Sequence, residues 1–331
     1  MPKRNVKKKI IIIGAGQIGS RHLQALRAVR HPLDIVVYDP SEKSLAQAKG
    51  RYDAFPSNAS PHSVHYTQQF PEITDRGIDI AILSTNSDAR RKMCENLLKF
   101  HRVKYIILEK LLFQKKSDFS IIQKLFHKSK TRAWVNCPMR IMPFYKNIKN
   151  ELGNKKIIYH VSGKFGLITT AIHYLDHMTY LTGCSNFTID TSRLEKKPVQ
   201  SKRKGFLEFQ GTLVANFMDG SVGIFTCEKG SANVPVINYI ECENFRSYTR
   251  ETEQKSWVSK KSNGWKWKEV MAPMPHQSQM TTGIINALIK NGSCPLPSYD
   301  DSMKIHLQYL LAIQKHMNSH SKKKYTFYPF T

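Results

Sequence analysis

The sequence predicts an α/β protein of two domains, residues 1–137 and 138–331, on three observations. With 331 residues, the chain is long enough to form two hydrophobic cores. In the first domain, short apolar runs alternate with amphipathic segments, which is typical of a doubly wound parallel sheet. In the second, several strand-like runs follow one another, which indicates an α+β domain with a mainly antiparallel, open sheet.

The strands and helices of the first domain can be placed from these patterns. A helix that begins after Ser41, a good N-capping residue, is expected to end at Gly50. Because strands and helices alternate, helices should cover both faces of the sheet. Buried strands are expected at residues 8–13, 34–39, 79–85, 105–110 and 132–137, and further helices at 89–100 and 117–128.

The second domain contains a clear hairpin signal. Apolar residues alternate over 213–217 up to Asp219-Gly220, a common hairpin turn. The polar, tryptophan-bearing segment 255–275 is expected to be a loop or a hairpin at the edge of the sheet. Further strands are expected at residues 156–163, 186–194, 205–211 and 213–227, and two helices, at 277–290 and 299–317, end the chain.

The net charge of +26 is the most unusual feature of the composition. Such a charge suggests a nucleic-acid partner. The lysines and arginines are spread along the chain, however, and it carries no known nucleic-acid-binding motif, so we do not expect nucleic acid to be the partner. Substrates that carry phosphate would also be attracted to this charge.

The apolar runs and the cysteines argue against a membrane-spanning protein, a secreted protein and a disulfide-bonded or zinc-binding protein. The longest apolar runs, such as residues 10–13, are too short to cross a membrane or to form the hydrophobic region of a signal peptide. The six cysteines show no CxxC spacing, which favours reduced thiols over a disulfide framework or a zinc site. With 40% hydrophobic residues, we expect a globular cytoplasmic protein without a metal.

A glycine-rich turn between the first strand and the first helix predicts a dinucleotide site, and with it a Rossmann domain. Gly14 permits the tight turn, Gly16 lets the backbone approach a diphosphate, and Gly19 allows the helix to pack closely on the strand. The first N–H groups of the helix would then face the phosphates. The turn matches the pattern GxGxxG and is expected to hold the cofactor through Gly14, Ala15, Gly16, Gln17, Ile18 and Gly19.

Asp39, at the end of the second strand, is expected to select the cofactor. A carboxylate there accepts hydrogen bonds from the adenine ribose and repels a 2′-phosphate, so NAD is favoured over NADP. Asp39 could instead form only a turn that caps the next helix. At the end of the strand 79–85, Ser84, Thr85 and Asn86 are expected to line the nicotinamide side of the site, although they could be ordinary loop residues.

Five motifs occur in the order, and at roughly the spacing, of one known family. Over nearly its whole length the chain resembles the Gfo/Idh/MocA oxidoreductases. The resemblance implies transfer of a hydride between NAD and a secondary hydroxyl or ketone of a sugar, a sugar nucleotide or a cyclitol. The ending LPSYDDSMKIHLQYL further resembles members associated with surface-polysaccharide gene clusters. The five motifs are GAGQIGSRH, DIAILSTNSDAR, ILEK, VNCPMR and IHYLDHMTYLTG, and they are specific for the family but not for a substrate.

The segment Glu109-Lys110-Leu111 stands where the family has Glu-Lys-Pro. The family's lysine reaches both the nicotinamide ribose and the substrate hydroxyl, so the resemblance implies that Lys110 is catalytic and that Glu109 and Lys110 contact the cofactor. A nearby positive charge stabilises a developing alkoxide. Because a cis peptide bond before leucine costs about 3–4 kcal/mol, we expect a trans bond between Lys110 and Leu111. Without the resemblance, Lys110 would be taken for a surface lysine.

His173 is the second catalytic residue that the resemblance implies. The family has an aspartate, then a histidine four residues later, then an aspartate three residues after that; here Thr169, His173 and Asp176 occupy these positions. An imidazole suits a general base because its pKa is close to neutral pH. Thr169 carries no charge and cannot raise the pKa of His173 as a carboxylate would. His173 and His177 could also bind a metal from one helix face, but the zincin pattern is not present.

Asn136, Arg140, Thr169 and Asp176 are expected to contact the substrate. Arg140 could pair with a phosphate or carboxylate of the substrate, or form a structural ion pair between the domains. Asp176 is expected to orient its neighbours. His22, on the inward face of the first helix, is expected to be packed and not catalytic.

Three other interpretations remain open from the sequence. The chain could be a regulator or scaffold that binds NAD without turning over a substrate, as the replacements at Leu111 and Thr169 suggest. It could also be a basic nucleic-acid-binding protein, or a glycosidase that uses NAD transiently. Because the open sheet of the second domain needs a cover, we expect a homodimer or homotetramer formed through it.

Overall fold

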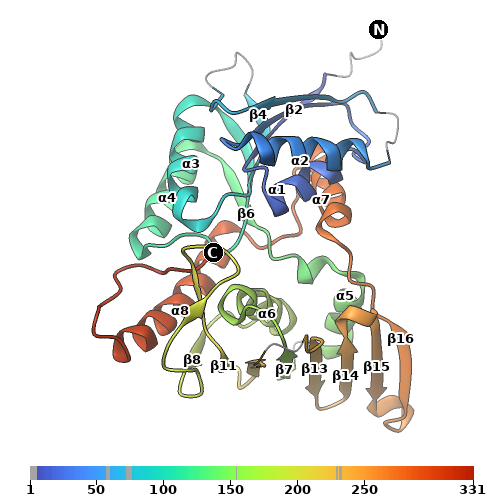
Figure 1. Ribbon diagram of the computed structural model, residues 1–331. Coiled ribbons are helices and arrows are strands. Elements are labelled where there is room, and N and C mark those ends of the chain that lie inside the picture. Colours follow the sequence, from blue (N-terminus) through green and yellow to red (C-terminus); the bar gives the residue numbers. More distant parts are fainter. Residues whose placement is uncertain (1–5, 57–59, 72–76, 154, 229, 231–232) are drawn as a thin grey trace. The chain divides into compact units, whose positions relative to one another are not determined.

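Two large β-sheets organise the chain, one in each of two compact units. The computed structural model describes residues 6–56, 60–71, 77–153, 155–228, 230 and 233–331 (Figure 1). The first unit contains the described residues up to Phe113, together with Ser117–Asn136 and Pro275–Tyr299. The second unit contains Gln114–Lys116, the described residues of Cys137–Met274, and Asp300–Thr331.

The sheet of the first unit has six strands in the order β3-β2-β1-β4-β5-β6, and all neighbouring strands are parallel. Residues 10–13 of the central strand β1 are at most 3% exposed, as expected for a strand between two layers of helices. The predicted doubly wound parallel sheet is confirmed. Its strands are β1 (Lys8–Ile13), β2 (Leu33–Tyr38), β3 (Ser63–Thr67), β4 (Ile78–Leu83), β5 (Val103–Leu108) and β6 (Arg132–Val135).

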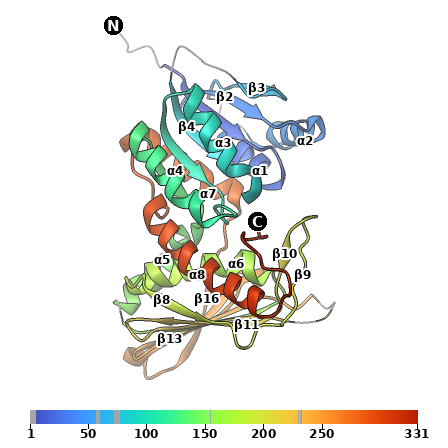
Figure 2. The same ribbon diagram turned by 90° about the vertical axis from the view of Figure 1, so that its left-hand side faces the viewer.

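Helices cover both faces of this sheet: α1 packs against α2 and α7, and α3 and α4 lie side by side on the other face (Figures 1 and 2). The hydroxyl oxygen of Ser41 caps α2 by accepting a hydrogen bond from Ser44 N at 3.2 Å. The expected end of this helix at Gly50 is wrong, because α2 continues to Asp53 and buries Tyr52 in its last turn. The helices are α1 (Gln17–Leu26), α2 (Glu42–Asp53), α3 (Ser87–Phe100), α4 (Lys116–Ser129) and α7 (Gln277–Asn291).

Helix α7 belongs to the first unit, whereas the division predicted at residues 137/138 assigns it to the second domain. The Thr282 hydroxyl donates to the carbonyl of Ala25 in α1 at 2.8 Å, and the Thr281 hydroxyl lies 2.8 Å from His22 Nδ1. These partners are 257 and 259 positions apart in the sequence. The patterns of neighbouring residues that placed the division could not show such contacts.

The second unit is built on an eight-stranded sheet in the order β16-β15-β14-β13-β7-β12-β11-β8. Strands β7 and β12 are parallel and the other neighbouring pairs are antiparallel, so the predicted mainly antiparallel sheet is confirmed. The β11–β12 hairpin turns at Asp219-Gly220, and β15 and β16 form the predicted edge hairpin. The strands are β7 (Ile158–Gly163), β8 (Phe187–Asp190), β11 (Gly211–Phe217), β12 (Val222–Cys227), β13 (Ile237–Cys242), β14 (Phe245–Arg250), β15 (Lys255–Lys260) and β16 (Trp267–Met271).

The strand expected over residues 205–211 is much shorter than the pattern suggests. Leu207–Glu208 form a two-residue strand, β10, which pairs with β9 (Val199–Gln200) in a separate two-stranded sheet, and Gly211 already begins β11. The N–H of Leu207 also donates to the carbonyl of Pro329 at 2.8 Å, near the end of the chain. Segment 205–211 is therefore held by distant contacts and not by the large sheet alone.

Three helices cover one face of the eight-stranded sheet: α5 (Pro143–Leu152), α6 (Leu167–Thr182) and α8 (Tyr299–Ser319) (Figures 1 and 2). No helix of the described residues covers the other face. A row of half-buried side chains, which we call the open-face row, crosses that face, each residue opposite the next in register. The row consists of Val214, Ile224, His160, Tyr239, Tyr248 and Trp257.

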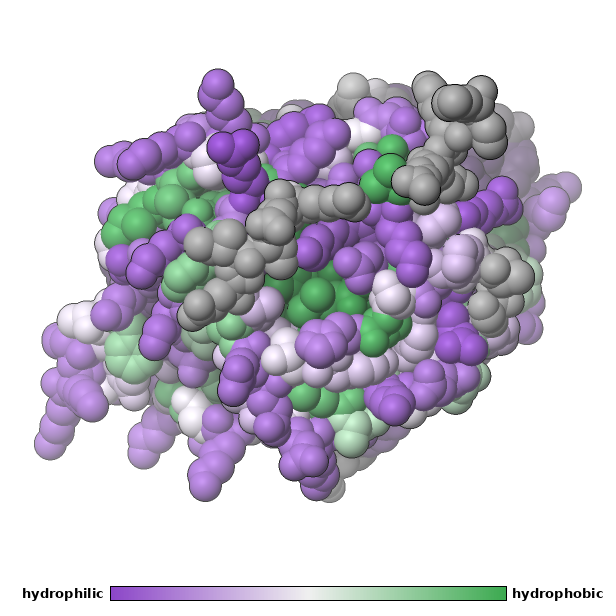
Figure 3. Space-filling model, turned by 90° about the horizontal axis from the view of Figure 1, so that it is seen from above, coloured by the Kyte–Doolittle hydropathy of each residue, from purple (hydrophilic) through white to green (hydrophobic). Residues whose placement is uncertain are grey.

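The described residues include no helix that is long and apolar enough to span a membrane. All six cysteines are free thiols. On the face shown in Figure 3, hydrophilic side chains cover most of the visible surface and surround small hydrophobic areas.

Candidate functional site

Two glycines of the turn after β1 leave no room for a side chain. Gly14 has a φ angle of +95°, and a Cβ atom there would lie 3.0 Å from backbone atoms of Ser84 and Thr85. A Cβ atom on Gly19 would overlap the carbonyl oxygen of Gly14. Gly14 and Gly19 are therefore needed to pack the start of α1 against β1 and the end of β4.

Gly16 differs from both, because space is free beside it. It is the N-cap of α1 with an ordinary φ angle of −63°, and a Cβ atom there would meet nothing within 4 Å. Among the described residues, no side chain caps this helix start. An open, uncapped helix N-terminus offers free N–H groups and the positive end of the helix dipole to an anion. The residues present therefore fit the diphosphate of a dinucleotide.

Asp39 follows β2 directly and faces the glycine turn. Its Oδ2 accepts a hydrogen bond from Ala15 N at 2.7 Å, and its Oδ1 accepts one from Ser41 N at 2.8 Å. The turn with a helix cap, which was the alternative interpretation of this residue, is thus present. It does not exclude a ribose contact, because each carboxylate oxygen can accept a second hydrogen bond.

The end of β4 places Ser84, Thr85 and Asn86 next to the glycine turn. The hydroxyl groups of Ser84 and Thr85 are buried and have no hydrogen-bond partner among the described residues. Asn86 is the exposed N-cap of α3, and its side chain makes no capping hydrogen bond. Buried hydroxyls without a partner are costly unless a ligand satisfies them, so Ser84 and Thr85 also fit a bound cofactor.

Arg51, in the last turn of α2, was not predicted as part of this site. Its guanidinium donates to Gln17 Oε1 at 2.8 Å and to Ser20 Oγ at 2.5 Å, in the first turns of α1. The pKa of Arg51 is lowered by burial and by the neighbouring charge of Arg21. A positive charge beside the uncapped helix start further favours an anion there. Arg51 lies just after Gly50, where the sequence predicts the end of the helix, and a single arginine there gives no sign of this role.

Four buried polar side chains and the half-buried Gln277 form a closed ring of hydrogen bonds, which we call the polar ring. Glu109 Oε1 lies 2.9 Å from His22 Nε2 and accepts a hydrogen bond from Asn136 Nδ2 at 2.6 Å. Asn136 Nδ2 also donates to Gln277 Oε1 at 2.9 Å, Gln277 Nε2 donates to Thr281 Oγ1 at 2.8 Å, and Thr281 Oγ1 lies 2.8 Å from His22 Nδ1. His22 is buried, as expected. The ring joins α1 and α7 to the ends of β5 and β6, and so fixes the segment that carries Lys110.

Glu109 holds a negative charge beside Lys110. Burial alone would raise the pKa of Glu109, but the hydrogen bond and charge of His22, together with Asn136 and Lys110, lower it below its usual value. Lys110 itself is half-buried. The polar ring thus keeps an ionised carboxylate next to the proposed catalytic lysine.

The peptide bond between Lys110 and Leu111 is cis, so the expected trans bond is wrong. The buried guanidinium of Arg90 donates to the carbonyl oxygens of Leu111, Leu112 and Thr85. The Leu111 side chain is 1% exposed. These tertiary contacts define the conformation of the segment, whereas the sequence shows only the intrinsic preference of a leucine.

Helix α6 of the second unit carries Thr169 and His173 on a half-buried face, while the intervening Ala171 and Ile172 are buried. Four residues separate Thr169 from His173, which places them one turn apart on the same side of the helix. The Thr169 hydroxyl donates to Glu208 Oε1 at 2.5 Å. The sequence did not predict that a carboxylate lies beside Thr169.

Arg140 and Asp176 form an ion pair within the second unit. Arg140 Nε donates to Asp176 Oδ2 at 3.0 Å and Arg140 Nη2 donates to Oδ1 at 2.6 Å. Burial raises the pKa of Asp176 to about 6, although the charge and hydrogen bonds of Arg140 act in the opposite direction. The structure therefore shows a structural ion pair for Arg140, but inside one unit and not between domains. Arg140 lies in a short 3-10 helix, Pro138–Ile141, and its guanidinium also packs on the ring of Tyr180.

A metal site on α6 is not supported by the surroundings of its histidines. His177 is fully buried, and its Nδ1 lies 2.9 Å from the Tyr159 hydroxyl. His173 lies on the half-buried face of the same helix. In the part of the chain that the structure describes, no group of three His, Cys, Asp or Glu side chains could hold a metal ion.

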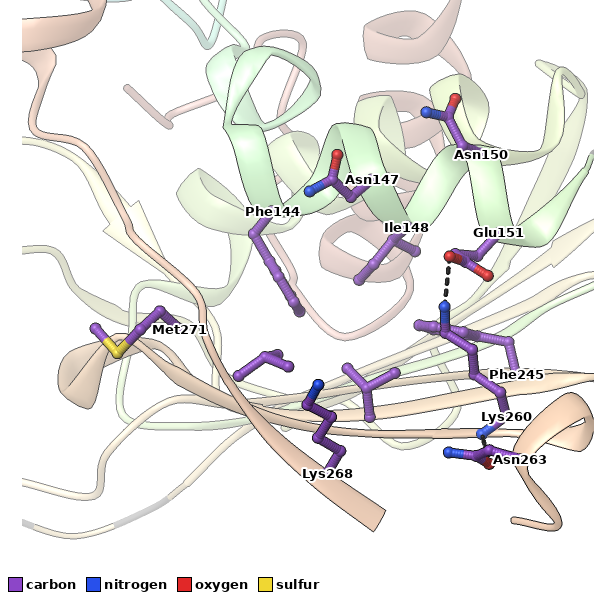
Figure 4. A pocket seen from close by; sticks show the side chains of 12 residues that line it. Phe144, Asn147, Ile148, Asn150, Glu151, Phe245, Lys260, Asn263, Lys268 and Met271 are labelled. Carbon is purple, nitrogen blue, oxygen red and sulfur yellow. Dashed lines mark hydrogen bonds and ion pairs between the residues drawn. The ribbon is translucent and has the colours of Figure 1, made fainter. Parts of the chain in front are cut away.

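A cavity of about 420 Å³ lies in the second unit between α5 and strands β14–β16 (Figure 4). Phe144 and Ile148 of α5 point toward the strands, and Phe245 of β14 also lines the cavity. A pair between Lys260 Nζ and Glu151 Oε1, at 2.5 Å, closes one end. None of the predicted site residues lines this cavity, so it is separate from the candidate site.

Comparisons with known proteins agree with the nucleotide site in the first unit. Residues 8–137 match the sequence model described as "Oxidoreductase family, NAD-binding Rossmann fold". No curated protein sequence matches the chain.

Solved structures show the same fold over both units. The chain is similar to UDP-N-acetylglucosamine 3-dehydrogenase from Acidithiobacillus ferrooxidans, with a TM-score of 0.67 and 13% identity, covering 93% of this chain and 97% of that one. It is similar to a levoglucosan dehydrogenase in complex with NADH and levoglucosan (TM-score 0.70, 15% identity, coverage 96% and 98%). It is also similar to biliverdin reductase from Synechocystis in complex with biliverdin and NADP+ (TM-score 0.69, 14% identity, coverage 92% and 98%).

At these identities the structural likeness establishes the fold alone, while the family match covers the glycine turn, Asp39, Ser84 to Asn86 and Lys110. Residues 8–137 therefore match the NAD-binding Rossmann domain of the Gfo/Idh/MocA oxidoreductase family, which confirms the resemblance for the motifs that lie within this range.

Proposed function

We propose that this protein transfers a hydride between NAD and a secondary hydroxyl or ketone of a carbohydrate, which is a sugar, a sugar nucleotide or a cyclitol. The observation that carries the proposal is the open, uncapped helix start at Gly16 within a matched NAD-binding domain. Two of the similar structures are dehydrogenases that act on sugar derivatives, levoglucosan and UDP-N-acetylglucosamine, and this supports the substrate class.

Asp39 favours NAD over NADP in this proposal. Its two oxygens already accept hydrogen bonds from Ala15 N and Ser41 N, which fix the negative charge at the end of β2. A ribose diol can donate further hydrogen bonds to a carboxylate, whereas a 2′-phosphate would be repelled by it. Bound NAD would supply the hydride acceptor at its nicotinamide ring.

In this proposal Lys110 and His173 both act on the substrate hydroxyl, one as a hydrogen-bond donor and the other as a general base. The ammonium group of Lys110 donates a hydrogen bond to the hydroxyl oxygen and lowers the free energy of the negative charge that develops there. Glu109, held in the polar ring, places a negative charge beside the ammonium group of Lys110. The imidazole of His173 accepts the hydroxyl proton, and returns it when the reaction runs toward the alcohol.

Asn136, Arg140, Thr169 and Asp176 position the substrate and its neighbours. The amide N–H groups of Asn136 donate to Glu109 and Gln277, while its buried Oδ1 has no partner among the described residues. This oxygen can accept a hydrogen bond from a ligand hydroxyl. Asp176 holds Arg140 by Nε and Nη2, which leaves the other N–H groups of the guanidinium for an anionic part of the substrate.

The proposal is tested with purified protein, NAD or NADH, and a panel of nucleotide sugars, free sugars, anhydrosugars and cyclitols, with biliverdin added as a substrate of a different class. Reduced-nicotinamide absorbance is followed in both directions. On the substrate that responds, Lys110→Ala and His173→Ala should each lower kcat/KM by about 10²-fold or more. Lys115→Ala and His65→Ala replace exposed residues and serve as matched controls.

If both Lys110→Ala and His173→Ala were fully active on the best substrate, neither residue would have the proposed catalytic role. Tight NAD binding without hydride transfer on any member of the panel would favour the regulator or scaffold. If biliverdin were the only compound turned over, the proposed carbohydrate substrate class would be wrong.

We also propose that two copies associate through the open face of the eight-stranded sheet. The open-face row presents tyrosine, tryptophan and branched aliphatic side chains on a face that no described helix covers. Aromatic side chains supply a large part of the buried area in protein interfaces. A second copy of the same face would bury this row in a symmetric dimer.

A further inference from the structure

Glu208 of β10 is a buried carboxylate that caps a helix from a distant part of the chain. It is 7% exposed. Its Oε2 accepts a hydrogen bond from Ile168 N at 2.7 Å, and its Oε1 accepts bonds from Thr169 N at 3.1 Å and from the Thr169 hydroxyl at 2.5 Å. Ile168 and Thr169 are the second and third residues of α6, so the carboxylate binds N–H groups that a local N-cap side chain usually satisfies.

The sequence around the start of α6 makes room for this carboxylate. Gly166 is the N-cap and has no side chain to cap the helix. A Cβ atom on Gly166 would lie 2.7 Å from Glu208 Oε1 and 2.5 Å from Thr169 Oγ1. Any other residue would push the carboxylate away from the helix. The cap of α6 therefore needs both a glycine at position 166 and a glutamate at position 208.

The same carboxylate binds α6 one turn before the proposed base. His173 follows Thr169 by four residues, and Cβ atoms at this spacing are about 5–6 Å apart. The Cα–Cβ bonds of a helix tilt toward its N-terminus, so the side chain of His173 leaves α6 in the direction of Thr169. Thr169 and His173 are both half-buried, while Ala171 and Ile172 between them are buried. A charge at Glu208 thus acts on His173 across one helical turn that is partly shielded from water.

Two titratable groups from other elements face Glu208. The Tyr309 hydroxyl of α8 donates to the carbonyl of Ile168 at 3.1 Å, and burial, followed by the charge of Glu208, raises the pKa of Tyr309 well above its usual value. Burial also raises the pKa of Cys227 in β12, to which the charge of Glu208 contributes. Both groups are neutral near pH 7. The ammonium group of Lys164, whose charge acts on Cys227, donates to the carbonyls of Glu228 and Gly230.

We propose that Glu208 is a positioning residue for His173, which fixes the Thr169 hydroxyl and the first turn of α6 and supplies the negative charge that makes the His173 imidazole a stronger proton acceptor. This rests on the proposed function, in which His173 accepts the substrate proton. The Glu208 carboxylate accepts three hydrogen bonds from the first turn of α6 and takes no part in the proton transfer itself. Thr169 alone carries no charge, and Glu208 brings a carboxylate to it from 39 positions away in the sequence.

The direct test is a pH titration of the histidine resonances by NMR in the full-length protein, with His173 assigned by the signal that is missing in His173→Asn. In Glu208→Gln the pKa of His173 should fall by about one unit, a tenfold weaker proton binding. In the double variant Thr169→Asp/Glu208→Gln, a carboxylate on the helix itself should restore most of the loss. The matched control is Glu253→Gln, an exposed carboxylate of the same unit, which should leave the pKa of His173 unchanged.

Loss of the cap will also lower stability, so the result is judged on the pKa and not on the melting temperature. A folded Glu208→Gln protein with an unchanged His173 pKa would show that Glu208 is only a helix cap, and would overturn the proposal. Should Glu208→Gln not fold, the wild-type protein supplies the answer. The carboxyl carbon resonance of Glu208 should then move at the pH at which His173 titrates, and this step should vanish in His173→Asn. Absence of the step would also overturn the proposal.

Kinetics separate this inference from the proposed function. With an active substrate, the acidic limb of the kcat/KM profile should move to lower pH in Glu208→Gln by the same amount as the His173 pKa. If no substrate is turned over, or if His173→Ala is fully active, the proposed function fails. The dependence of the His173 pKa on Glu208 is measured by NMR without turnover. Its outcome therefore does not depend on whether the proposed function is correct.

Discussion

The backbone N–H of Ala15 donates to Asp39 Oδ2 across 2.7 Å, so the carboxylate that we expect to recognise the adenine ribose also holds the glycine turn in place. Its other oxygen accepts from Ser41 N, and Ser41 in turn caps α2. One carboxylate thus fixes the diphosphate-binding turn and the start of the next helix. Its replacement should therefore affect cofactor binding in two ways, through lost charge and through a looser turn.

We expect Asp39→Asn to weaken NAD binding and to reduce the preference over NADP. A hydrogen bond to a charged acceptor contributes about 1.5–3 kcal/mol, so the Kd for NADH should rise about tenfold or more. The Kd for NADPH should rise less, because the repulsion of the 2′-phosphate is removed. Calorimetric titration with both cofactors checks this, with the exposed Glu42→Gln as control. An unchanged ratio of the two Kd values would mean that Asp39 does not select the cofactor.

The two glycines Gly16 and Gly19 should respond differently to alanine. Gly16→Ala has free space and an ordinary φ angle, so the melting temperature should stay the same or rise slightly. Its methyl group would occupy the place of the diphosphate, and NADH affinity should fall at least about tenfold. Gly19→Ala would overlap the Gly14 carbonyl and should lower the free energy of unfolding by about 1–3 kcal/mol. Tight NADH binding by Gly16→Ala would place the diphosphate elsewhere.

Elements with continuous or strongly periodic patterns could be predicted from the sequence almost to the residue. The strand expected at residues 8–13 is β1, because a buried parallel strand is a run of apolar residues. The helix expected at 277–290 is α7, which ends one residue later. The edge strand β3 was not predicted, because none of its residues 63–67 is fully buried and its pattern is mixed. The unit to which α7 belongs depends on contacts with α1, such as that between Thr282 and Ala25, which no local pattern contains.

The same distinction holds for the candidate site. The glycine turn could be recognised because its six residues are contiguous and their order carries the chemistry. Arg51 and Glu208 could not, because each reaches the site only through the fold. The cis bond after Lys110 was missed for a related reason. The intrinsic preference of a peptide bond is a property of two residues, whereas the contacts of Arg90 with this segment are tertiary.

The open-face row predicts the oligomeric state and a variant that changes it. If two copies pair through this face, light scattering after size-exclusion chromatography should give at least twice the chain mass of 38.1 kDa. Trp257→Glu would place a charge next to the ring of Tyr248, whose centroid lies 6.0 Å away, and should shift the protein toward monomer. Met218→Glu changes a side chain that is 77% exposed at a hairpin turn and serves as control. A wild-type protein that is monomeric at all concentrations would exclude this interface.

The polar ring should make a measurable contribution to the stability of the first unit. Thr281→Val keeps the shape of the side chain but removes the partner of His22 Nδ1 and the acceptor for Gln277 Nε2. Because a buried polar group that loses its partner costs about 1–3 kcal/mol, the free energy of unfolding should fall by this amount in urea titrations. Thr282→Val, on the same helix, removes one bond from a half-buried residue and should cost less. Equal effects of the two variants would mean that the ring contributes no more than a single hydrogen bond.

His177 should make the stability of the second unit depend on pH. Burial, followed by the charges of Arg140 and Lys149, lowers its pKa to about 3, whereas in the unfolded chain it is about 6.5. Because the folded-state pKa is depressed, this contribution is fully present above pH 6.5 and is lost as the pH falls toward 3. Between these values the unfolded chain binds a proton that the folded chain does not, with a slope of up to about 1.4 kcal/mol per pH unit. Asp176 acts in the opposite sense, since its pKa is raised to about 6 and its contribution decreases as the pH rises toward that value.

His177→Asn isolates the contribution of His177. The asparagine oxygen can still accept the hydrogen bond of the Tyr159 hydroxyl, which lies 2.9 Å from His177 Nδ1, but it does not titrate. At pH 7 the variant should be less stable than the wild type, because the imidazole packs against Tyr145 with ring centroids 4.4 Å apart. Toward pH 4 the difference between the two proteins should shrink by about 3 kcal/mol, because only the wild type loses the His177 contribution. Urea unfolding at pH 7, 6, 5 and 4, with the exposed His65→Asn as control, measures this. A difference that stays constant over this range would show that His177 takes up its proton inside the folded protein.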